Sequence, residues 1–235
     1  MDSLPILLLI FVVGLATLVK ASDFFTDAAE KIGLAIGLPP FIVGVTIVSM
    51  GTSLPELLSS LLGIFQGAPE VVASNVIGSN IANICLVVGT AAILSTKLLR
   101  VMYNLISVDL PLFVGSAFLF ALMASSEQRF TQGEALILVI GYIVYLFYIL
   151  QSSDETASST DEEPVAPSLA SPPFSTARSL REILILILSG IFIFLGANYT
   201  IDSLIQISDR LNIGKDIIAI SAVALGTSLP ELMVT

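Results

Sequence analysis

The chain has 235 residues, of which 55% are hydrophobic and 12% are charged, and its mean hydropathy is +0.98. This composition excludes a soluble domain, whose surface needs more polar side chains, and it predicts an all-α polytopic membrane protein. The net charge of −10 says little about partners, because five of the carboxylates lie in one polar stretch. With no histidine and one cysteine, an internal disulfide is excluded and any bound metal ion should have oxygen ligands.

Five membrane-spanning helices are predicted in the first part of the chain. No basic residue precedes the first apolar stretch, so it is interpreted as a span and not as a signal peptide. The second and third spans exceed the roughly 20 residues that a bilayer requires, so tilt or breakage is expected. The predicted spans are residues 4–19, 39–65, 70–94, 105–123 and 134–150, and residues 27–36 are predicted as an interfacial amphipathic helix.

A polar stretch divides the chain into two halves. Residues 151–181 are rich in Ser, Thr, Pro and acidic side chains, which predicts a disordered linker. A sixth span is expected over residues 183–205, and a seventh begins near residue 213. The predicted domains are a first repeat of five helices (1–150), the linker (151–181) and the start of a second repeat, truncated in its second helix (182–235).

The segment MGTSLPEL at residues 50–57 recurs as LGTSLPEL at residues 225–232. A constant offset of 175 aligns the two copies and also pairs Asp27 with Asp202. Because five spans precede the linker, the second copy should enter the membrane from the opposite side. Such inverted repeats are typical of secondary transporters, whose substrate site lies at the repeat interface. The distribution of Lys and Arg favours an N-terminus outside and a cytoplasmic linker.

The repeated motif places a proline and a glutamate inside an apolar segment. Pro55 has no N–H and its ring clashes with the carbonyl of Gly51, so the second span should break there. Glu56 follows the break directly, and Glu231 occupies the same position in the second copy. A charge at the bilayer centre costs about 2.5 kcal/mol or more. We therefore expect a bound cation or proton to neutralise these two carboxylates.

Hydroxyl groups accompany each glutamate. Thr52 and Ser53 precede Glu56 by four and three residues, which places them on the same side of a helix, and Thr227 and Ser228 repeat this arrangement in the second copy. Six to eight such oxygens would suit Ca²⁺, and fewer would suit Na⁺.

The third span carries a polar stripe of Asn75, Ser79 and Asn83, spaced four residues apart. These side chains would add neutral oxygens to the site. A purely structural role, as a hydrogen bond to a neighbouring helix, is an equal alternative for Asn75 and Asn80. Asp109 lies near the predicted start of its helix, where a helix-dipole role is favoured.

The paired GTSLPE segments, together with GSNIAN at residues 78–83, resemble the alpha repeats of the sodium/calcium exchangers of the calcium/cation antiporter superfamily. The resemblance implies ten spans in two inverted halves, of which about seven are present here, so the chain is expected to be a truncated member. It also implies a plasma-membrane antiporter that exchanges Na⁺ for Ca²⁺ by alternating access. Such a protein is not an enzyme and needs no cofactor beyond its transported ions.

The resemblance further implies residue roles. Glu56 and Glu231 correspond to central calcium-coordinating carboxylates shared with Na⁺, while Ser49 and Ala224 correspond to positions that offer a main-chain carbonyl to sodium. Independently of the resemblance, the first and sixth spans are our candidates for the gating helices, because they are long, have expected flexible points at Gly14 and Gly196 and carry no site residue. The full set of implied metal-binding residues is Glu56, Glu231, Thr52, Ser53, Ser79, Asn83, Thr227, Ser228, Ser49 and Ala224.

Other functions stay open at this point. The same carboxylates would also support proton/calcium exchange, and a requirement for K⁺ is undetermined. A non-transporting membrane fragment is a further alternative. An ion channel is disfavoured, since its polar residues would line several helices along their length. The expected partners are Ca²⁺, Na⁺ and the lipid bilayer, not nucleic acid, with the oligomeric state left open.

Overall fold

The structure, a computed structural model, describes residues 3–38, 43–95, 107–127, 130–157 and 176–228. The regular elements in these ranges are all helical, which confirms the predicted all-α class. The chain divides into two compact units, residues 1–96 with 169–235, and residues 97–168. Each unit is described by itself.

The described part of the larger unit contains five helical segments, three of which include a π-helical stretch (η). The first is α1 (Leu4–Ala35). The second comprises η1 (Val43–Val48), α3 (Ser49–Thr52) and α4 (Leu54–Phe65). The third comprises α5 (Glu70–Ile81), η2 (Ala82–Val88) and α6 (Gly89–Leu94). The fourth is α9 (Thr176–Leu211), and the fifth comprises α10 (Lys215–Ile218), η3 (Ala219–Val223) and α11 (Ala224–Thr227).

Helix α1 is one continuous helix of 32 residues, so the predicted end of the first span at residue 19 is wrong. Several of its polar side chains have partners within the helix. The Ser22 and Thr26 hydroxyls donate to carbonyl oxygens one turn earlier, at 3.0 and 2.9 Å, and Lys20 Nζ lies 3.0 Å from Asp23 Oδ2. The predicted interfacial helix at 27–36 is therefore the last part of α1.

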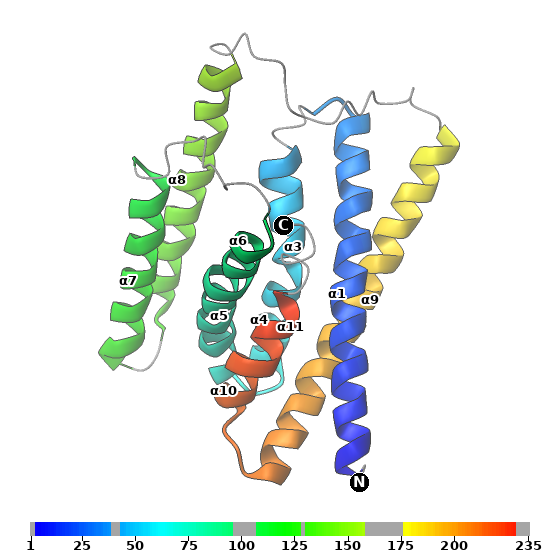
Figure 1. Ribbon diagram of the computed structural model, residues 1–235, viewed down its shortest axis with the longest axis vertical. Coiled ribbons are helices and arrows are strands. Elements are labelled where there is room, and N and C mark those ends of the chain that lie inside the picture. The colour runs from blue at the N-terminus through cyan, green and yellow to red at the C-terminus, as the bar shows by residue number, and fades with distance from the viewer. Residues whose placement is uncertain (1–2, 39–42, 96–106, 128–129, 158–175, 229–235) are drawn as a thin grey trace. The chain divides into compact units, whose positions relative to one another are not determined.

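Helices α1 and α9 pack against each other in opposite directions (Figure 1). Gly14 contacts Thr200 near the middle of the pair, and toward the end of α1 Lys31 Nζ lies 3.9 Å from Glu182 Oε2. As the residue numbers rise along α1, the numbers of the α9 residues that contact it fall. This opposite direction is the relation that an inverted repeat predicts.

Two glycines permit the close approach of α1 and α9. A Cβ at Gly196 would lie 2.6 Å from the backbone nitrogen of Leu18, and one at Gly14 would lie 3.1 Å from that of Thr200. Both helices run unbroken through these positions. The interpretation of Gly14 and Gly196 as flexible points is therefore wrong: they are packing points, beside core residues such as Leu18 and Ile201.

The second span breaks where the sequence predicted. The segment Thr46–Thr52 and the segment Leu54–Phe65 are bent by 48° relative to each other, with Ser53 between them. Pro55 lies in the first turn of α4, where its missing N–H is tolerated. The break therefore falls just before the proline.

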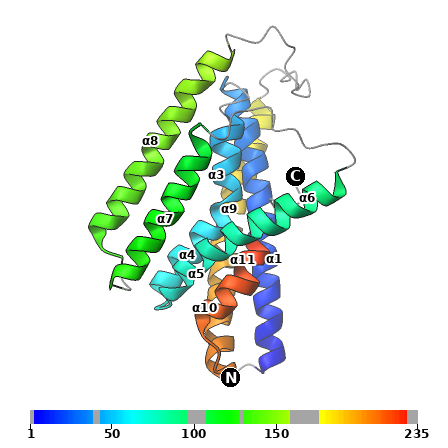
Figure 2. The same cartoon turned by 60° about the vertical axis from the view of Figure 1, so that its left-hand side comes forward.

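Helix α5 lies between α4 and the second copy of the motif (Figure 2). On the second-copy side, Lys215 Nζ is 3.6 Å from Glu70 Oε1. Further along, a Cβ at Gly78 would lie 2.6 Å from the carbonyl oxygen of Ile220 and 2.5 Å from the Cβ of Ala224. Helix α5 and the segment from α10 to α11 therefore run in the same direction and touch closely at Gly78.

The smaller unit is a pair of helices, α7 (Asp109–Glu127) and α8 (Gln132–Ala157). The Tyr145 hydroxyl donates to Asp109 Oδ1 at 3.0 Å, which joins the start of α7 to α8. Thr131 and Glu134 form a reciprocal capping box at the start of α8, with Thr131 N donating to Glu134 Oε2 at 2.8 Å.

Helices extend into both ends of the predicted linker, since α8 continues to Ala157 and α9 begins at Thr176. The expected disorder is therefore wrong for residues 151–157 and 176–181, while residues 158–175 lie outside the described ranges. The assignment of the two halves as repeats stays a prediction.

Four helices of the described chain are long and apolar enough to cross a membrane, and the bent pair of Thr46–Thr52 and Leu54–Phe65 would make a fifth. The four are Leu4–Ala35, Glu70–Leu94, Gln132–Ile149 and Leu180–Leu211. Large apolar side chains such as Phe65 and Ile93 are exposed on these elements. Such surfaces match lipid tails, and the polytopic membrane class is thereby confirmed.

Candidate functional site

The carboxylate of Glu56 lies in the first turn of α4, directly after the bend. Both of its oxygens are buried from solvent. The N-terminal turn of a helix carries partial positive charge from its free N–H groups, which stabilises an ionised carboxylate. The broken helix thus places a negative group inside the larger unit at the point where the chain changes direction.

Asn75 connects α5 to this turn. The side chain is fully buried, and its Nδ2 donates to the carbonyl oxygen of Glu56 at 3.1 Å and to Ser60 Oγ at 3.2 Å. Asn75 therefore makes the hydrogen bonds to a neighbouring helix that its alternative structural role predicts. Asn80, for which the same alternative was weighed, is exposed.

Ser79 and Asn83 follow Asn75 at intervals of four residues. Ser79 Oγ and Asn83 Oδ1 are both buried and have no hydrogen-bond partner among the described residues. Burying a polar oxygen without a partner costs free energy, so such atoms point to a ligand or water. Asn83 also lies in the π-helical segment η2, a conformation that is frequent at functional sites.

The second copy of the motif contributes two buried hydroxyl groups. Thr227 is fully buried and its Oγ1 donates to the carbonyl oxygen of Ala224 at 3.3 Å. Ser228 is nearly fully buried, and its Oγ has no partner in the part of the chain that the structure describes. Glu231 lies outside the described residues.

In the first copy, the equivalent residues are less enclosed. Thr52 is half-buried and its Oγ1 donates to the carbonyl oxygen of Ser49 at 3.1 Å, whereas Ser49 and Ser53 are exposed. Helices α4, α5 and α11 nevertheless contact one another in all three pairs. The structure therefore brings the elements that carry Glu56, Ser79 and Ser228 together and leaves the Ser53 side chain at the surface.

The motif glycines let α1 approach both copies. A Cβ at Gly51 would overlap the side chain of Thr26, and one at Gly226 would overlap that of Leu15. Both overlaps are with side chains of α1, eleven positions apart. Helix α1 therefore packs on the motif glycine of both copies, which sequence reasoning did not anticipate.

Two hydroxyl groups near Glu56 were also missed. Ser59 is fully buried, with an Oγ that has no partner among the described residues, and Ser60 accepts the hydrogen bond from Asn75. They follow Glu56 by three and four residues, the spacing of one helix face. The same spacing rule that identified Thr52 and Ser53 could have identified Ser59 and Ser60 from the sequence.

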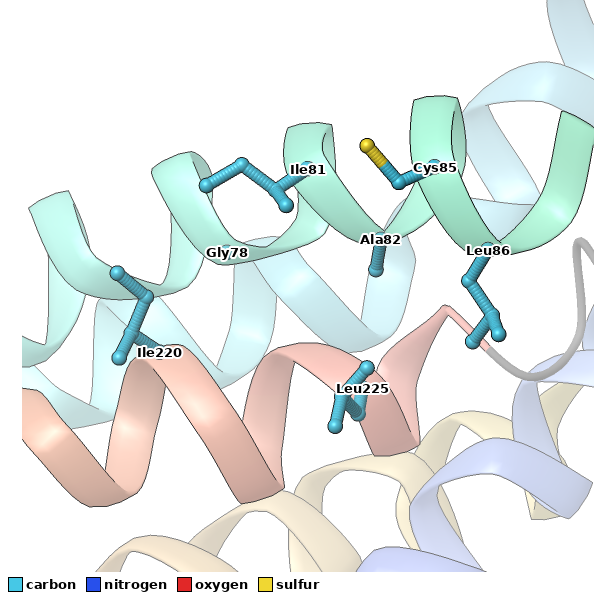
Figure 3. A pocket seen from close by; sticks show the side chains of 7 residues that line it. All are labelled: Gly78, Ile81, Ala82, Cys85, Leu86, Ile220 and Leu225. Atoms are coloured by element: carbon cyan, nitrogen blue, oxygen red, sulfur yellow. The ribbon is translucent and has the colours of Figure 1, made fainter. Parts of the chain in front are cut away.

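A small pocket of about 220 Å³ lies between the segment from α5 to η2 and the segment from η3 to α11. Figure 3 shows that apolar side chains, among them Ile81, Ile220 and Leu225, line it together with the Cys85 thiol. The pocket therefore offers few oxygens to a cation and is distinct from the polar atoms around Glu56.

Among the described residues, no three His, Cys, Asp or Glu side chains form a group that could hold a metal ion. A cation at Glu56 would therefore depend on hydroxyl, amide and main-chain oxygens from this part of the chain. Hard cations such as Ca²⁺ accept ligands of this kind.

Comparison with known proteins agrees with the geometry. The family model for sodium/calcium exchanger proteins matches residues 6–151 and 181–235. The sodium/calcium exchanger MaX1 of Methanosarcina acetivorans is 31% identical over 97% of this chain and 73% of its own length. An uncharacterized membrane protein of Methanocaldococcus jannaschii is 34% identical over 96% of this chain and 69% of its own. A putative antiporter, CaxA of Alkalimonas amylolytica, is 28% identical over 94% and 67%. No solved structure matches.

Proposed function

The chain belongs to the sodium/calcium exchanger protein family, and from this premise we propose that it exchanges Na⁺ for Ca²⁺ across a membrane by alternating access. Proteins of this family are transporters, so the chain is a membrane antiporter component and not an enzyme. The observation that carries the ion assignment is the pair of buried carboxylate oxygens of Glu56 at the break in a membrane helix.

The proposed cation site surrounds this carboxylate with neutral oxygens. Ser79 Oγ, Asn83 Oδ1 and Ser228 Oγ support it, because each is buried without a partner among the described residues. Ca²⁺ prefers six to eight oxygens, and two carboxylates would balance its charge. The proposed ligands are Glu56, Glu231, Thr52, Ser53, Ser79, Asn83, Thr227, Ser228 and the main-chain carbonyls of Ser49 and Ala224.

The two threonine hydroxyl groups are suited to a ligand role by their hydrogen bonds. Thr52 Oγ1 donates its hydrogen bond to the Ser49 carbonyl oxygen, and Thr227 Oγ1 donates its hydrogen bond to the Ala224 carbonyl oxygen. A hydroxyl oxygen keeps two lone pairs as acceptors when its hydrogen is engaged. Each threonine can therefore present lone pairs to a cation without turning its hydrogen toward that cation.

Competition for the same carboxylates would couple the two ions. Ca²⁺ or several Na⁺ neutralise the site, and only a neutralised site lets the helices around it move through the low-dielectric membrane. In this proposal α1 and α9 move together against the broken helices, since they pack closely on each other at Gly14 and Gly196. We further propose that the protein lies in the plasma membrane, with its N-terminus outside the cell and the linker in the cytoplasm.

The test is uptake of radiolabelled Ca²⁺ into proteoliposomes that contain the full-length protein. Vesicles are preloaded with Na⁺, with K⁺ or with a low-pH buffer. Uptake that requires an outward Na⁺ gradient is the expected result, and an additional need for K⁺ would assign a potassium-dependent exchanger. Uptake driven by protons alone would contradict Na⁺ exchange and favour a proton/calcium antiporter.

A further inference from the structure

Asn75 is a buried amide whose hydrogen bonds, among the described residues, run to one neighbouring helix, α4. Its side chain has no exposed surface, and its Nδ2 lies 3.1 Å from the Glu56 carbonyl oxygen and 3.2 Å from Ser60 Oγ. A carboxamide nitrogen has two hydrogens, so each acceptor can receive one. Both donors of Asn75 are thus directed at α4.

The two acceptors are one helical turn apart on α4. Bonds to residues 56 and 60 from a single point on α5 limit both rotation of α4 about its axis and sliding along α5. Asn75 holds the main-chain carbonyl of Glu56, the residue that carries the carboxylate. The anchor therefore fixes the backbone position from which the carboxylate extends.

The anchor is needed because α4 is not held from its N-terminal side by a continuous helix. The backbone bends by 48° at Ser53, and Pro55 contributes no N–H to the preceding turn. Without a contact from outside, the first turn of α4 would be held only by packing. A buried hydrogen bond supplies direction as well as attraction.

Helix α5 also packs on the segment that leads into the second copy of the motif. Gly78, three residues after Asn75, approaches the Ile220 carbonyl and the Ala224 side chain so closely that a Cβ would lie 2.6 and 2.5 Å from them. Helix α5 also carries Ser79, whose Oγ is buried beside this contact. Asn75 therefore ties the Glu56 backbone to α5, the helix that carries Ser79 and packs on the segment leading into the second copy.

We propose that Asn75 is a positioning residue for the cation site, which acts by holding Glu56 at a fixed place relative to Ser79. It acts on the Glu56 backbone through the two hydrogens of Nδ2, while its Oδ1 is buried without a partner among the described residues. The identity of the ion rests on the proposed function, but the anchor itself rests on the two hydrogen bonds.

The test uses Asn75→Leu in the full-length protein, which keeps the side-chain size, removes both donors and adds no charge. Asn80→Leu is the matched control, since Asn80 lies on the same helix and is exposed. Binding of Ca²⁺ to the purified proteins is measured by calorimetry, and thermal unfolding is measured on the same samples. We expect Asn75→Leu to raise the Ca²⁺ Kd about tenfold, the factor that a lost buried hydrogen bond is worth, and Asn80→Leu to leave it unchanged.

A purely structural role would lower the Tm of Asn75→Leu while the Ca²⁺ Kd stays at the wild-type value, and that result would overturn the proposal. If Asn75→Leu does not fold, Ser60→Ala is used as a second test of the anchor. It removes one acceptor and keeps the Glu56 bond, so a smaller increase in Kd is expected, and an unchanged Kd would count against the anchor.

A hydrogen-exchange measurement separates this proposal from the proposed function. If the wild-type protein binds no Ca²⁺, the proposed function fails, and the anchor is then judged by amide exchange at residues 57–60. The anchor is supported if amide exchange at residues 57–60 is faster in Asn75→Leu than in the wild type while amide exchange in α9 is the same in both. Unchanged exchange at residues 57–60 refutes it.

Discussion

Thr227 makes, in the second copy of the motif, the same hydrogen bond that Thr52 makes in the first. Each hydroxyl donates to the carbonyl oxygen three residues earlier, Thr52 to Ser49 at 3.1 Å and Thr227 to Ala224 at 3.3 Å. The pairs are related by the offset of 175 that aligns the two copies. The two copies therefore share local geometry as well as sequence, although Thr227 is fully buried and Thr52 is half-buried.

This equivalence predicts matched effects of Thr52→Val and Thr227→Val. Valine keeps the branched shape and removes the hydroxyl, so each variant loses one proposed oxygen ligand and one hydrogen bond worth about 1 kcal/mol. We expect each to raise the half-saturating Ca²⁺ concentration of uptake by about fivefold to tenfold. Thr52→Ser and Thr227→Ser, which keep the hydroxyl, should stay near wild type. Effects confined to one copy would argue against a shared site.

Glu56→Gln should abolish Ca²⁺ uptake by the full-length protein nearly completely, by about a hundredfold or more. The amide keeps the shape but removes the charge that offsets the cost of bringing a cation into the membrane. Uptake by proteoliposomes is the measurement. Substantial retained exchange would contradict the assignment.

Glu70→Gln is the matched control for this variant. Glu70 lies in the first turn of α5, as Glu56 lies in the first turn of α4, but it is exposed and forms an ion pair with Lys215 at 3.6 Å. Exposed ion pairs contribute about 0–1 kcal/mol. Uptake should therefore be retained in Glu70→Gln, and a similar loss in both variants would indicate a non-specific effect.

Gly196→Ala should destabilise the larger unit. The new Cβ would lie 2.6 Å from the Leu18 nitrogen and 2.9 Å from the Gly14 carbonyl oxygen, which are backbone atoms of α1 and cannot move aside like a flexible side chain. Overpacking of this kind costs about 1–3 kcal/mol. Thermal unfolding of the purified protein in detergent should show a lower Tm.

Gly190→Ala, on the same helix, provides the comparison. The nearest atom to its Cβ would be the Phe25 ring at 4.0 Å, an ordinary contact. Because alanine favours a helix over glycine by about 1 kcal/mol, the Tm of this variant should be unchanged or higher. If both substitutions lowered the Tm equally, the close approach at Gly196 would not be the cause.

Tyr145→Phe should loosen the pair of α7 and α8. The substitution removes the hydroxyl that donates to Asp109 Oδ1 at 3.0 Å and leaves the ring in place. A hydrogen bond to a charged group is worth about 1.5–3 kcal/mol, less where it is partly solvated. Faster amide exchange in the first turn of α7 is the expected readout. Tyr148→Phe, with an exposed ring, should leave that exchange unaltered.

Much of this architecture follows from local patterns in the chain. The apolar content predicted the membrane class, Pro55 predicted the break that the structure has at Ser53, and the repeated motif predicted that α9 runs opposite to α1. The residue types around Glu56 predicted a site built of oxygens. Each of these inferences needed only composition, a spacing or the covalent chemistry of one residue.

The remaining features depend on contacts between residues that are far apart in the chain. Gly14 and Gly196 look like flexible points in isolation and become packing points because each meets backbone atoms of the other helix. Helix α1 continues past Lys20, and several of its polar side chains have partners within it and beside it. Asn75 anchors Glu56 only because α5 folds back along α4 and buries an amide against a carbonyl. Spacing along the chain carries no record of which partner a buried side chain meets, since that depends on how separate helices pack.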